Sequence, residues 1–361
     1  MTNHRLHIKN KYHQYRQFLK TFKQDLNISF QRIIGNVTDV FCTGKNVFFT
    51  QFNRALNVNK AELGRFRGCL LGLACGDAVG TTVEFKIRGT FKPVKDMVGG
   101  GPFNLKIGEW TDDTSMALCL AASLIERGQF DAKDQMEKYC LWMDTGYMSS
   151  NGRFFDIGHA TLKALRTFQQ TGMPFSGSTE KYSAGNGCLM RLAPIPLFFY
   201  PNKERIMEMS ANSSRTTHAT HECLEASQLF GAMLFMALSG ESKEDILFGH
   251  GITHLDSDGL TAIAQGDYRN KKIYEVKGSG YVVESLEAAL WCFWQTHTFQ
   301  AAILLAANLG DDADTTAAIC GQIAGAYYGV SNIPSHWKKR LVMKEEIIGM
   351  ADKLYRHEAA H

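Results

Sequence analysis

Apolar and small residues are distributed unevenly along the chain, and they become much denser from about Glu62 onward. Beyond it, runs of helix length rich in Gly, Ala and Leu follow one another, separated by polar breaks. Several runs end in glycine, a common residue at helix C-termini. The pattern predicts helices beginning near Arg65, Ser115, Asp131, Gly158, Glu222, Glu284, Phe299, Thr315 and Lys339.

Strand-like runs are few and short in this region, and Tyr281–Val283 is one of them. Residues 250–280 are polar and contain glycine, so we interpret them as an excursion between helices. The run after Thr315 carries small residues that favour close helix packing in a soluble core: Ala317, Ala318, Gly321, Ala324 and Gly325. We therefore predict one compact all-α domain over residues 61–361.

Residues 1–60 differ from the rest of the chain in charge. They hold ten Lys and Arg against Asp25 and Asp39, a net charge of +8, whereas the remainder carries 29 basic and 34 acidic residues, or −5. This basic extension also contains aromatic residues, which anchor many interfaces. We predict a partner-docking arm; the alternatives are a helical lid on the main domain and a strand-binding surface for nucleic acid.

The cysteines, the N-terminus and the lengths of the apolar runs indicate the cellular compartment of the protein. The nine cysteines are scattered and form no CxxC pair, which indicates buried thiols in a reducing compartment. The polar N-terminus lacks an apolar signal core, and no apolar run is long enough to span a bilayer. A cytoplasmic protein without membrane association is the expectation.

Two acidic clusters stand directly before apolar helical runs. One is Trp110-Thr111-Asp112-Asp113-Thr114, and the other runs from Gly310 to Thr316 and contains Asp311, Asp312 and Asp314. Such residues cap helices, but one cap needs only one of them. If the clusters converge, at least four carboxylates share one site and their repulsion requires cations. Because all the donors are oxygen atoms, Mg²⁺ or Mn²⁺ is favoured over Zn²⁺.

A third element is the glycine-rich run Gly68–Gly80, which includes Asp77 and is followed by Glu84. Its glycines allow close helix packing and then a turn. We interpret Asp77 as a structural cap or hydrogen-bond acceptor. Glu84 is the candidate fifth carboxylate, placed to orient or deprotonate water near a metal pair.

These elements, in this order, resemble the ADP-ribosylglycohydrolase family, which includes the dinitrogenase reductase activating glycohydrolase. The similarity continues through Asp156-Ile157-Gly158, Gly185–Pro194, Thr217-His218, Gly280–Val283 and Gly321–Ala326. The resemblance implies a compact, orthogonal multi-helix all-α domain that binds two Mg²⁺ or Mn²⁺ ions. The implied metal ligands are Thr111, Asp112, Asp113, Asp312, Asp314 and Thr315.

The resemblance also assigns the other site residues. Glu84, Asp113 and Asp156 are the implied catalytic residues, with Asp156 near the leaving group. The implied substrate-binding residues are Gly185, Asn186, Gly187, His218 and Tyr281, the last as a platform for adenine or as a core aromatic. His159 departs from the family pattern, because asparagine is expected there in the activating-glycohydrolase branch.

The predicted function is metal-dependent removal of ADP-ribose from a modified protein, most plausibly from arginine. Residues 1–60 would contact an ADP-ribosyltransferase toxin if the chain is an immunity protein, and no nucleic-acid partner is expected. The alternatives are an ADP-ribose-binding module or transferase blocker without essential catalysis, and a metal phosphohydrolase acting on a nucleotide.

Overall fold

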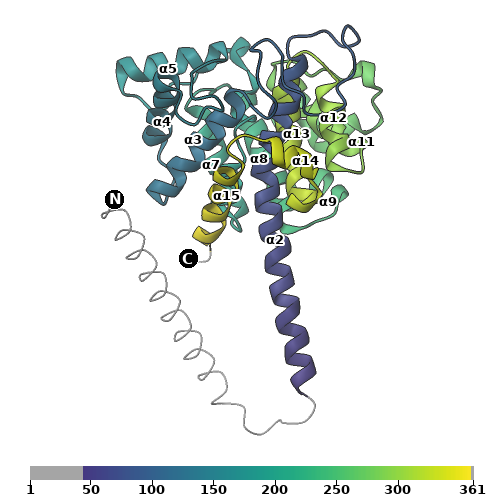
Figure 1. The fold of residues 1–361 in the computed structure, drawn as a ribbon. Coiled ribbons are helices and arrows are strands. Elements are labelled where there is room, and N and C mark those ends of the chain that lie inside the picture. The colour runs from purple at the N-terminus through teal and green to yellow at the C-terminus, as the bar shows by residue number, and fades with distance from the viewer. Residues whose placement is uncertain (1–43, 359–361) are drawn as a thin grey trace, which may run out of the picture. The chain divides into compact units, whose positions relative to one another are not determined.

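The computed structural model describes the backbone of residues 44–358 and the side chains of residues 60–356 (Figure 1). The described residues form helices and isolated bridges but no β-strand, as the predicted all-α class requires. The helices are α2 (Gly44–Gly80), α3 (Asp112–Arg127), α4 (Ala132–Thr145), α5 (His159–Thr171), α6 (Pro194–Phe199), α7 (Lys203–Arg215), α8 (His221–Ser239), α9 (Lys243–Phe248), α10 (Asp258–Gln265), α11 (Val282–Gln295), α12 (Phe299–Ala307), α13 (Ala313–Tyr328), α14 (Ser335–Arg340) and α15 (Lys344–Glu358).

The helix boundaries follow local capping chemistry. Asp131 caps α4, because its side chain accepts hydrogen bonds from the backbone N–H groups of Lys133 and Asp134. Five of the described helices end at a left-handed glycine, a residue type that the sequence pattern leads us to expect there: Gly128, Gly146, Gly172, Gly240 and Gly266. Seven predicted starts, from Ser115 to Thr315 in chain order, lie within three residues of an observed helix start.

Three local predictions are wrong. No helix begins near Arg65, because α2 already starts at Gly44. Tyr281–Val283 is not a strand: Tyr281 forms an isolated bridge with Gly185, and Val282 and Val283 begin α11 with both side chains buried. β-Branched residues at a helix start resemble a short strand when the sequence is read alone. No helix begins at Lys339, because α14 already spans that residue and α15 starts at Lys344.

The sequence pattern also misses helices whose buried face is small or polar. In α7, Ile206 and Met209 are buried together with Ser210, Ser213 and Ser214. The serines weaken the apolar periodicity by which a helix is recognised. The expected excursion over residues 250–280 contains one further short α-helix, α10, and two 3-10 turns, Asp267–Asn270 and Ile273–Glu275.

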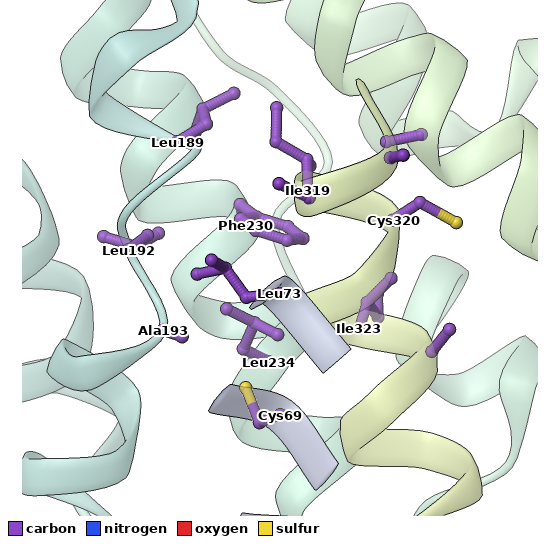
Figure 2. Packing of buried hydrophobic residues seen from close by; sticks show 14 of the residues in the cluster. Cys69, Leu73, Leu189, Leu192, Ala193, Phe230, Leu234, Ile319, Cys320 and Ile323 are labelled. Carbon is purple, nitrogen blue, oxygen red and sulfur yellow. The ribbon is translucent and has the colours of Figure 1, made fainter. Parts of the chain in front are cut away.

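The core of the domain surrounds α13. Cys69 and Leu73 of α2, Phe230 and Leu234 of α8, and Ile319 of α13 lie side by side in it, as Figure 2 shows. Helices α11 and α12 pack against α13, whereas α3 and α4 pack against each other. A second cluster lies between α3, α4 and α5 and includes the ring of Trp142.

Helices α2 and α13 lie in direct backbone contact along a ladder of small residues. A Cβ atom added to Gly72 would lie 2.2 Å from the Gly321 carbonyl oxygen, and one added to Gly76 would lie 2.1 Å from that of Ala317. Only residues without a Cβ fit at this separation. The predicted close packing is thereby confirmed, and it brings the turn after α2 to the start of α13.

The described cysteines are free and buried, as the sequence predicts; they are Cys69, Cys75, Cys119, Cys140, Cys188, Cys223, Cys292 and Cys320. Within the described part of the chain, no helix has the length and apolarity needed to cross a bilayer. The predicted docking arm falls largely outside the described residues, since residues 1–43 have no described backbone and residues 44–59 no described side chains.

Candidate active site

One cavity of about 280 Å³ collects most of the predicted site residues. It is bounded by the turn after α2, the starts of α3, α5 and α13, and the loop before α6. The predicted residues that line it are Glu84, Asp112, Asp156, Gly185, Asn186, Gly187, His218, Asp312, Asp314 and Thr315. Thr111 and Asp113 are buried beside this cavity, in contact with its lining.

The start of α3 is fixed by Asp77 of α2. One carboxylate oxygen accepts hydrogen bonds from the backbone N–H and the hydroxyl of Thr111, both at 2.9 Å. The other accepts from the backbone N–H and the hydroxyl of Thr114, at 3.0 and 2.6 Å. The interpretation of Asp77 as a structural acceptor is therefore confirmed, and it sets where Asp112 and Asp113 lie.

Asp113 and Asp314 connect the two acidic clusters. The Thr315 hydroxyl donates to Asp113 Oδ1 at 3.1 Å, and the Thr111 hydroxyl lies 3.3 Å from Asp314 Oδ2. Asp113 Oδ2 and Asp314 Oδ1 are buried without a hydrogen-bond partner. A buried carboxylate oxygen that lacks a donor is costly, and a cation removes that cost.

Helix capping does not account for these side chains. Thr111 and Asp312 occupy the N-cap positions of α3 and α13, yet neither side chain makes a capping hydrogen bond. Carboxylate oxygens of Asp77, Asp113 and Asp314 lie within 4.8 Å of one another, and so do those of Glu84, Asp156 and Asp314. All these donors are oxygen atoms, the set that hard divalent cations prefer. This buried acidic set is able to hold metal ions.

The proximity of the carboxylates shifts their titration. Burial, together with the charges of Asp112 and Asp312, raises the pKa of Glu84 to about 8. Burial raises the pKa of Asp112 to about 7, and burial with the Asp112 and Glu84 charges raises that of Asp156 to about 11. For Asp113 and Asp314, burial first and neighbouring carboxylates second raise the pKa well above the ordinary value.

Backbone hydrogen bonds hold the loop that carries Glu84 against the second acidic cluster, at residues with strained φ angles. Phe85 and Asp311 both have left-handed φ angles, 62° and 54°, which are uncommon for residues other than glycine. The Phe85 N–H donates to the Asp311 carbonyl at 2.7 Å, and the Asp311 N–H donates to the Lys86 carbonyl at 2.8 Å. Arg88 secures the loop by donating from Nε to the Leu309 carbonyl at 2.9 Å.

The Gly185–Asn186–Gly187 loop faces the acidic side of the cavity through Asn186. The Asn186 amide donates to Asp312 Oδ2 at 2.8 Å and to the Ser285 hydroxyl at 3.1 Å. Its backbone N–H donates to the Gly280 carbonyl at 3.1 Å, so α11 helps to hold the loop. The loop is thereby fixed at a defined distance from the carboxylates.

Tyr281 lies apart from the main cavity. It lines a neighbouring hollow of about 450 Å³ that shares Gly185 and Gly280 with the main cavity. Its side chain is 39% exposed, and its hydroxyl donates to Glu222 at 2.7 Å. The core interpretation of Tyr281 is thus wrong, whereas a stacking role stays a prediction.

Sequence reasoning overlooked several contributors. Ser285 supports Asn186, Arg88 secures the Glu84 loop, and Thr161 and Phe85 line the cavity. These residues belong to no acidic or glycine-rich motif, so the sequence alone gave no local signal for them. His159, which departs from the family pattern, also lines the cavity, beside Asp156.

The all-helical fold encloses a carboxylate-lined cavity that suits metal-assisted hydrolysis. A family model described as ADP-ribosylglycohydrolase matches residues 59–361. The chain belongs to the ADP-ribosylglycohydrolase family, as the sequence resemblance predicts.

Two curated relatives and one solved structure are similar to this chain over most of its length. It is 47% identical over 294 residues to the ADP-ribosylarginine hydrolase Tri1 of Serratia proteamaculans (strain 568), covering 81% of this chain and 80% of that one. It is 45% identical to the protein of the same description from Pseudomonas putida (strain GB-1), covering 81% and 78%. A solved structure titled ADP-ribosylglycohydrolase-related protein complex matches with a TM-score of 0.75 and 41% identity, over 82% of this chain and 99% of that one.

Proposed function

We propose that this chain hydrolyses the N-glycosidic bond between ADP-ribose and an arginine side chain of a modified protein. The observation that carries the proposal is the convergence of the acidic clusters with the Gly185–Gly187 loop on one cavity. The names of the relatives from Serratia and Pseudomonas support the arginine linkage. An ADP-ribose-binding module without catalysis is the alternative, and a cytoplasmic location stays a prediction from the sequence.

Two divalent cations, Mg²⁺ or Mn²⁺, complete this proposal. The residues that would hold them are Thr111, Asp112, Asp113, Asp312, Asp314 and Thr315. The two buried oxygen atoms without hydrogen-bond partners, one each from Asp113 and Asp314, support the choice. When bound, the cations supply positive charge that orients the ribose hydroxyls and acidifies water.

The chain's own residues divide the remaining work. Glycosidic cleavage develops positive charge at the ribose C1 atom and requires proton transfers. Glu84, which lines the cavity within reach of Asp156 and Asp314, accepts a proton from the attacking water. Asp156 accepts hydrogen bonds from the guanidinium leaving group. The Gly185–Gly187 loop and His218 receive the phosphates and the adenosine ribose, and Tyr281 stacks on adenine.

A substrate panel tests the reaction. Arginine-, serine- and acetyl-linked ADP-ribose substrates are incubated with the protein in Mg²⁺, in Mn²⁺ and in chelator, and released ADP-ribose is measured. Arginine-specific release that chelator abolishes is expected. Binding of ADP-ribose without any release supports the reader alternative, and release of phosphate from a nucleotide supports a phosphohydrolase.

Residues 1–60 are proposed to dock an ADP-ribosyltransferase toxin, so that the protein acts as an immunity protein. Their net charge of +8 and their position largely outside the family match support a role beyond catalysis. Deleting residues 1–55 is expected to preserve hydrolysis while a transferase partner is lost from pull-downs. Unfolding of the truncated protein, or unchanged capture of the partner, would instead indicate a structural segment.

A further inference from the structure

Arg191 is a buried cation that pairs with no anion among the described residues. It follows the Gly185–Gly187 loop by four residues, and its side chain is fully buried. Within the described part of the chain, no carboxylate forms a salt bridge with it. The guanidinium lies 4.8 Å from the centroid of the Tyr139 ring, and Nε has no hydrogen-bond partner. An unpaired buried charge is expensive, so its retention calls for a reason beyond packing.

The shortest hydrogen bond of Arg191 connects it, through Thr217, to a residue of the active site. Its Nη2 donates to the Thr217 hydroxyl oxygen at 2.6 Å, and that oxygen lies 2.8 Å from His218 Nδ1. The other oxygen contacts of Nη2, with Ser213 and Thr216, are 3.4 and 3.5 Å long. Arg191, Thr217 and His218 therefore form a chain of hydrogen bonds that ends at an imidazole lining the cavity.

The partners of the Thr217 hydroxyl favour one direction for this chain. A guanidinium only donates, so the Thr217 oxygen accepts from Arg191. That oxygen keeps a second lone pair, but among the described hydrogen bonds its single proton has one acceptor, His218 Nδ1. This arrangement leaves His218 neutral, with its proton on Nε2. Burial and the Arg191 charge agree with it, because they lower the pKa of His218 to about 3.

The Nε2 end of His218 lies directly against the loop. A Cβ atom added to Gly187 would come within 3.1 Å of Nε2 and 2.7 Å of Cε1, and one added to Gly185 would lie 3.2 Å from Nε2. The imidazole therefore leaves no room for a Cβ atom at Gly187 and little room for one at Gly185. Its N–H is presented where the loop borders the cavity.

We propose that Arg191 and Thr217 are positioning residues that fix His218 as a neutral Nε2–H donor to an oxygen atom of bound ADP-ribose. The inference rests on the proposed function for the identity of the ligand. Neutral histidine presents a donor at Nε2 in only one of its two tautomers, and the hydrogen-bond chain selects that tautomer before the ligand arrives. The buried guanidinium also adds positive charge behind the surface that receives the pyrophosphate.

The tautomer is measured on the full chain by ¹⁵N-histidine NMR without ligand. We expect the Nε2–H form of His218 in wild type and in Thr217→Ser, which keeps the hydroxyl, and loss of this preference in Thr217→Val. The matched control is Thr216→Val, because Thr216 is an equally buried neighbour whose hydroxyl donates to the Ser213 carbonyl instead. An Nδ1–H form in wild type overturns the proposal, whether or not Thr217→Val folds.

Binding and kinetics supply the second readout. Calorimetry is expected to show about tenfold weaker ADP-ribose binding for Thr217→Val, with the affinity of Thr217→Ser and Thr216→Val unchanged. On the modified protein, KM rises for Thr217→Val while kcat is preserved. Equal affinity of Thr217→Val and wild type overturns the positioning role. Failure of wild type to bind ADP-ribose refutes the proposed function instead and leaves the tautomer assignment standing.

Discussion

The two sides of the active-site cavity carry opposite, unbalanced charges. On the acidic side, six carboxylates gather, and no described lysine or arginine forms a salt bridge with them: Glu84, Asp112, Asp113, Asp156, Asp312 and Asp314. On the loop side, the Gly185–Gly187 loop and His218 stand in front of Arg191, which has no carboxylate partner among the described residues. Each side disfavours folding when left alone, and we infer that a ligand of opposite charge relieves each: cations on the acidic side and the pyrophosphate on the loop side.

The largest effect is expected on the acidic side. Asp113→Ala and Asp314→Ala should each abolish hydrolysis, since losing a direct ligand should exceed the roughly 100-fold effects of outer-shell partners. The folded domain should persist, because these residues contribute charge rather than core packing. Released ADP-ribose and the thermal shift produced by Mg²⁺ are the measurements. Turnover at the wild-type rate in either variant, with chelator present, would refute the two-metal hypothesis.

Glu84→Gln separates chemistry from binding on the same side. The amide keeps the shape of the side chain but cannot accept the proton, so kcat should fall by about 10²- to 10⁴-fold. Calorimetry should show unchanged affinity for ADP-ribose. Parallel losses of affinity and rate would make Glu84 a binding residue instead.

Arg191→Gln tests the loop side, and its effects are expected to be the opposite of those of Asp113→Asn. Removing the buried charge should weaken ADP-ribose binding by about tenfold or more, the range for hydrogen bonds to charged groups. The Mg²⁺-dependent thermal shift should stay intact, whereas Asp113→Asn should lose that shift. If both variants lose both responses, the two sides do not act as separate charge sites.

The smallest effect is on the stability of the chelated protein. Burial and neighbouring carboxylates raise the pKa of Asp112 to about 7 and that of Glu84 to about 8. In the folded state these two carboxyl groups stay protonated up to pH 7 to 8, whereas in the unfolded chain they lose their protons near pH 4. Their contribution to the free energy of unfolding is therefore fully present below pH 4 and is lost as the pH rises through about 8. In chelator, the melting temperature should fall from pH 5.5 to 8, by about 2 °C for each kcal/mol.

Asp113→Asn is the control for this pH dependence. It removes one charge from the cluster, so the melting temperature in chelator should depend less on pH than in wild type. Saturating Mg²⁺ should flatten the wild-type profile as well, because the cations replace the bound protons. A wild-type melting temperature that rises between pH 5.5 and 8 relative to Asp113→Asn would contradict the assigned shifts.

The sequence predicts the acidic side much better than the loop side. Asp112 and Asp314 stand in compact acidic motifs at helix starts, which mark both segments as candidate metal-binding sites, and the family resemblance implies that they converge. Arg191 and Thr217 are 26 residues apart, and their relation to His218 depends on how the loop before α6 meets the end of α7. No local pattern encodes that meeting, which requires the three-dimensional packing.

The same limit explains the errors in secondary structure. Val282 and Val283 resemble a strand by composition, but burial against the core makes them the first turn of α11. Ser210 and Ser213 conceal the buried face of α7, because their small side chains fit a close helix contact without adding hydrophobicity. In both cases tertiary packing overrides the local preference.

The glycine ladder between α2 and α13 makes catalysis vulnerable to changes that never touch the substrate. A Cβ atom at Gly80 would lie 2.4 Å from the Ala313 carbonyl oxygen, next to Asp314, whereas Gly68 meets Gly325 at the far end of the ladder. An alanine at Gly80 would therefore widen the gap between the Glu84 turn and the second acidic cluster. A mutagenesis screen scored for lost activity should recover such positions among its hits. The glycines of α2 and α13 thus set the separation of the two helices, and through it the geometry of the active-site carboxylates, although they contribute no side chain to the site.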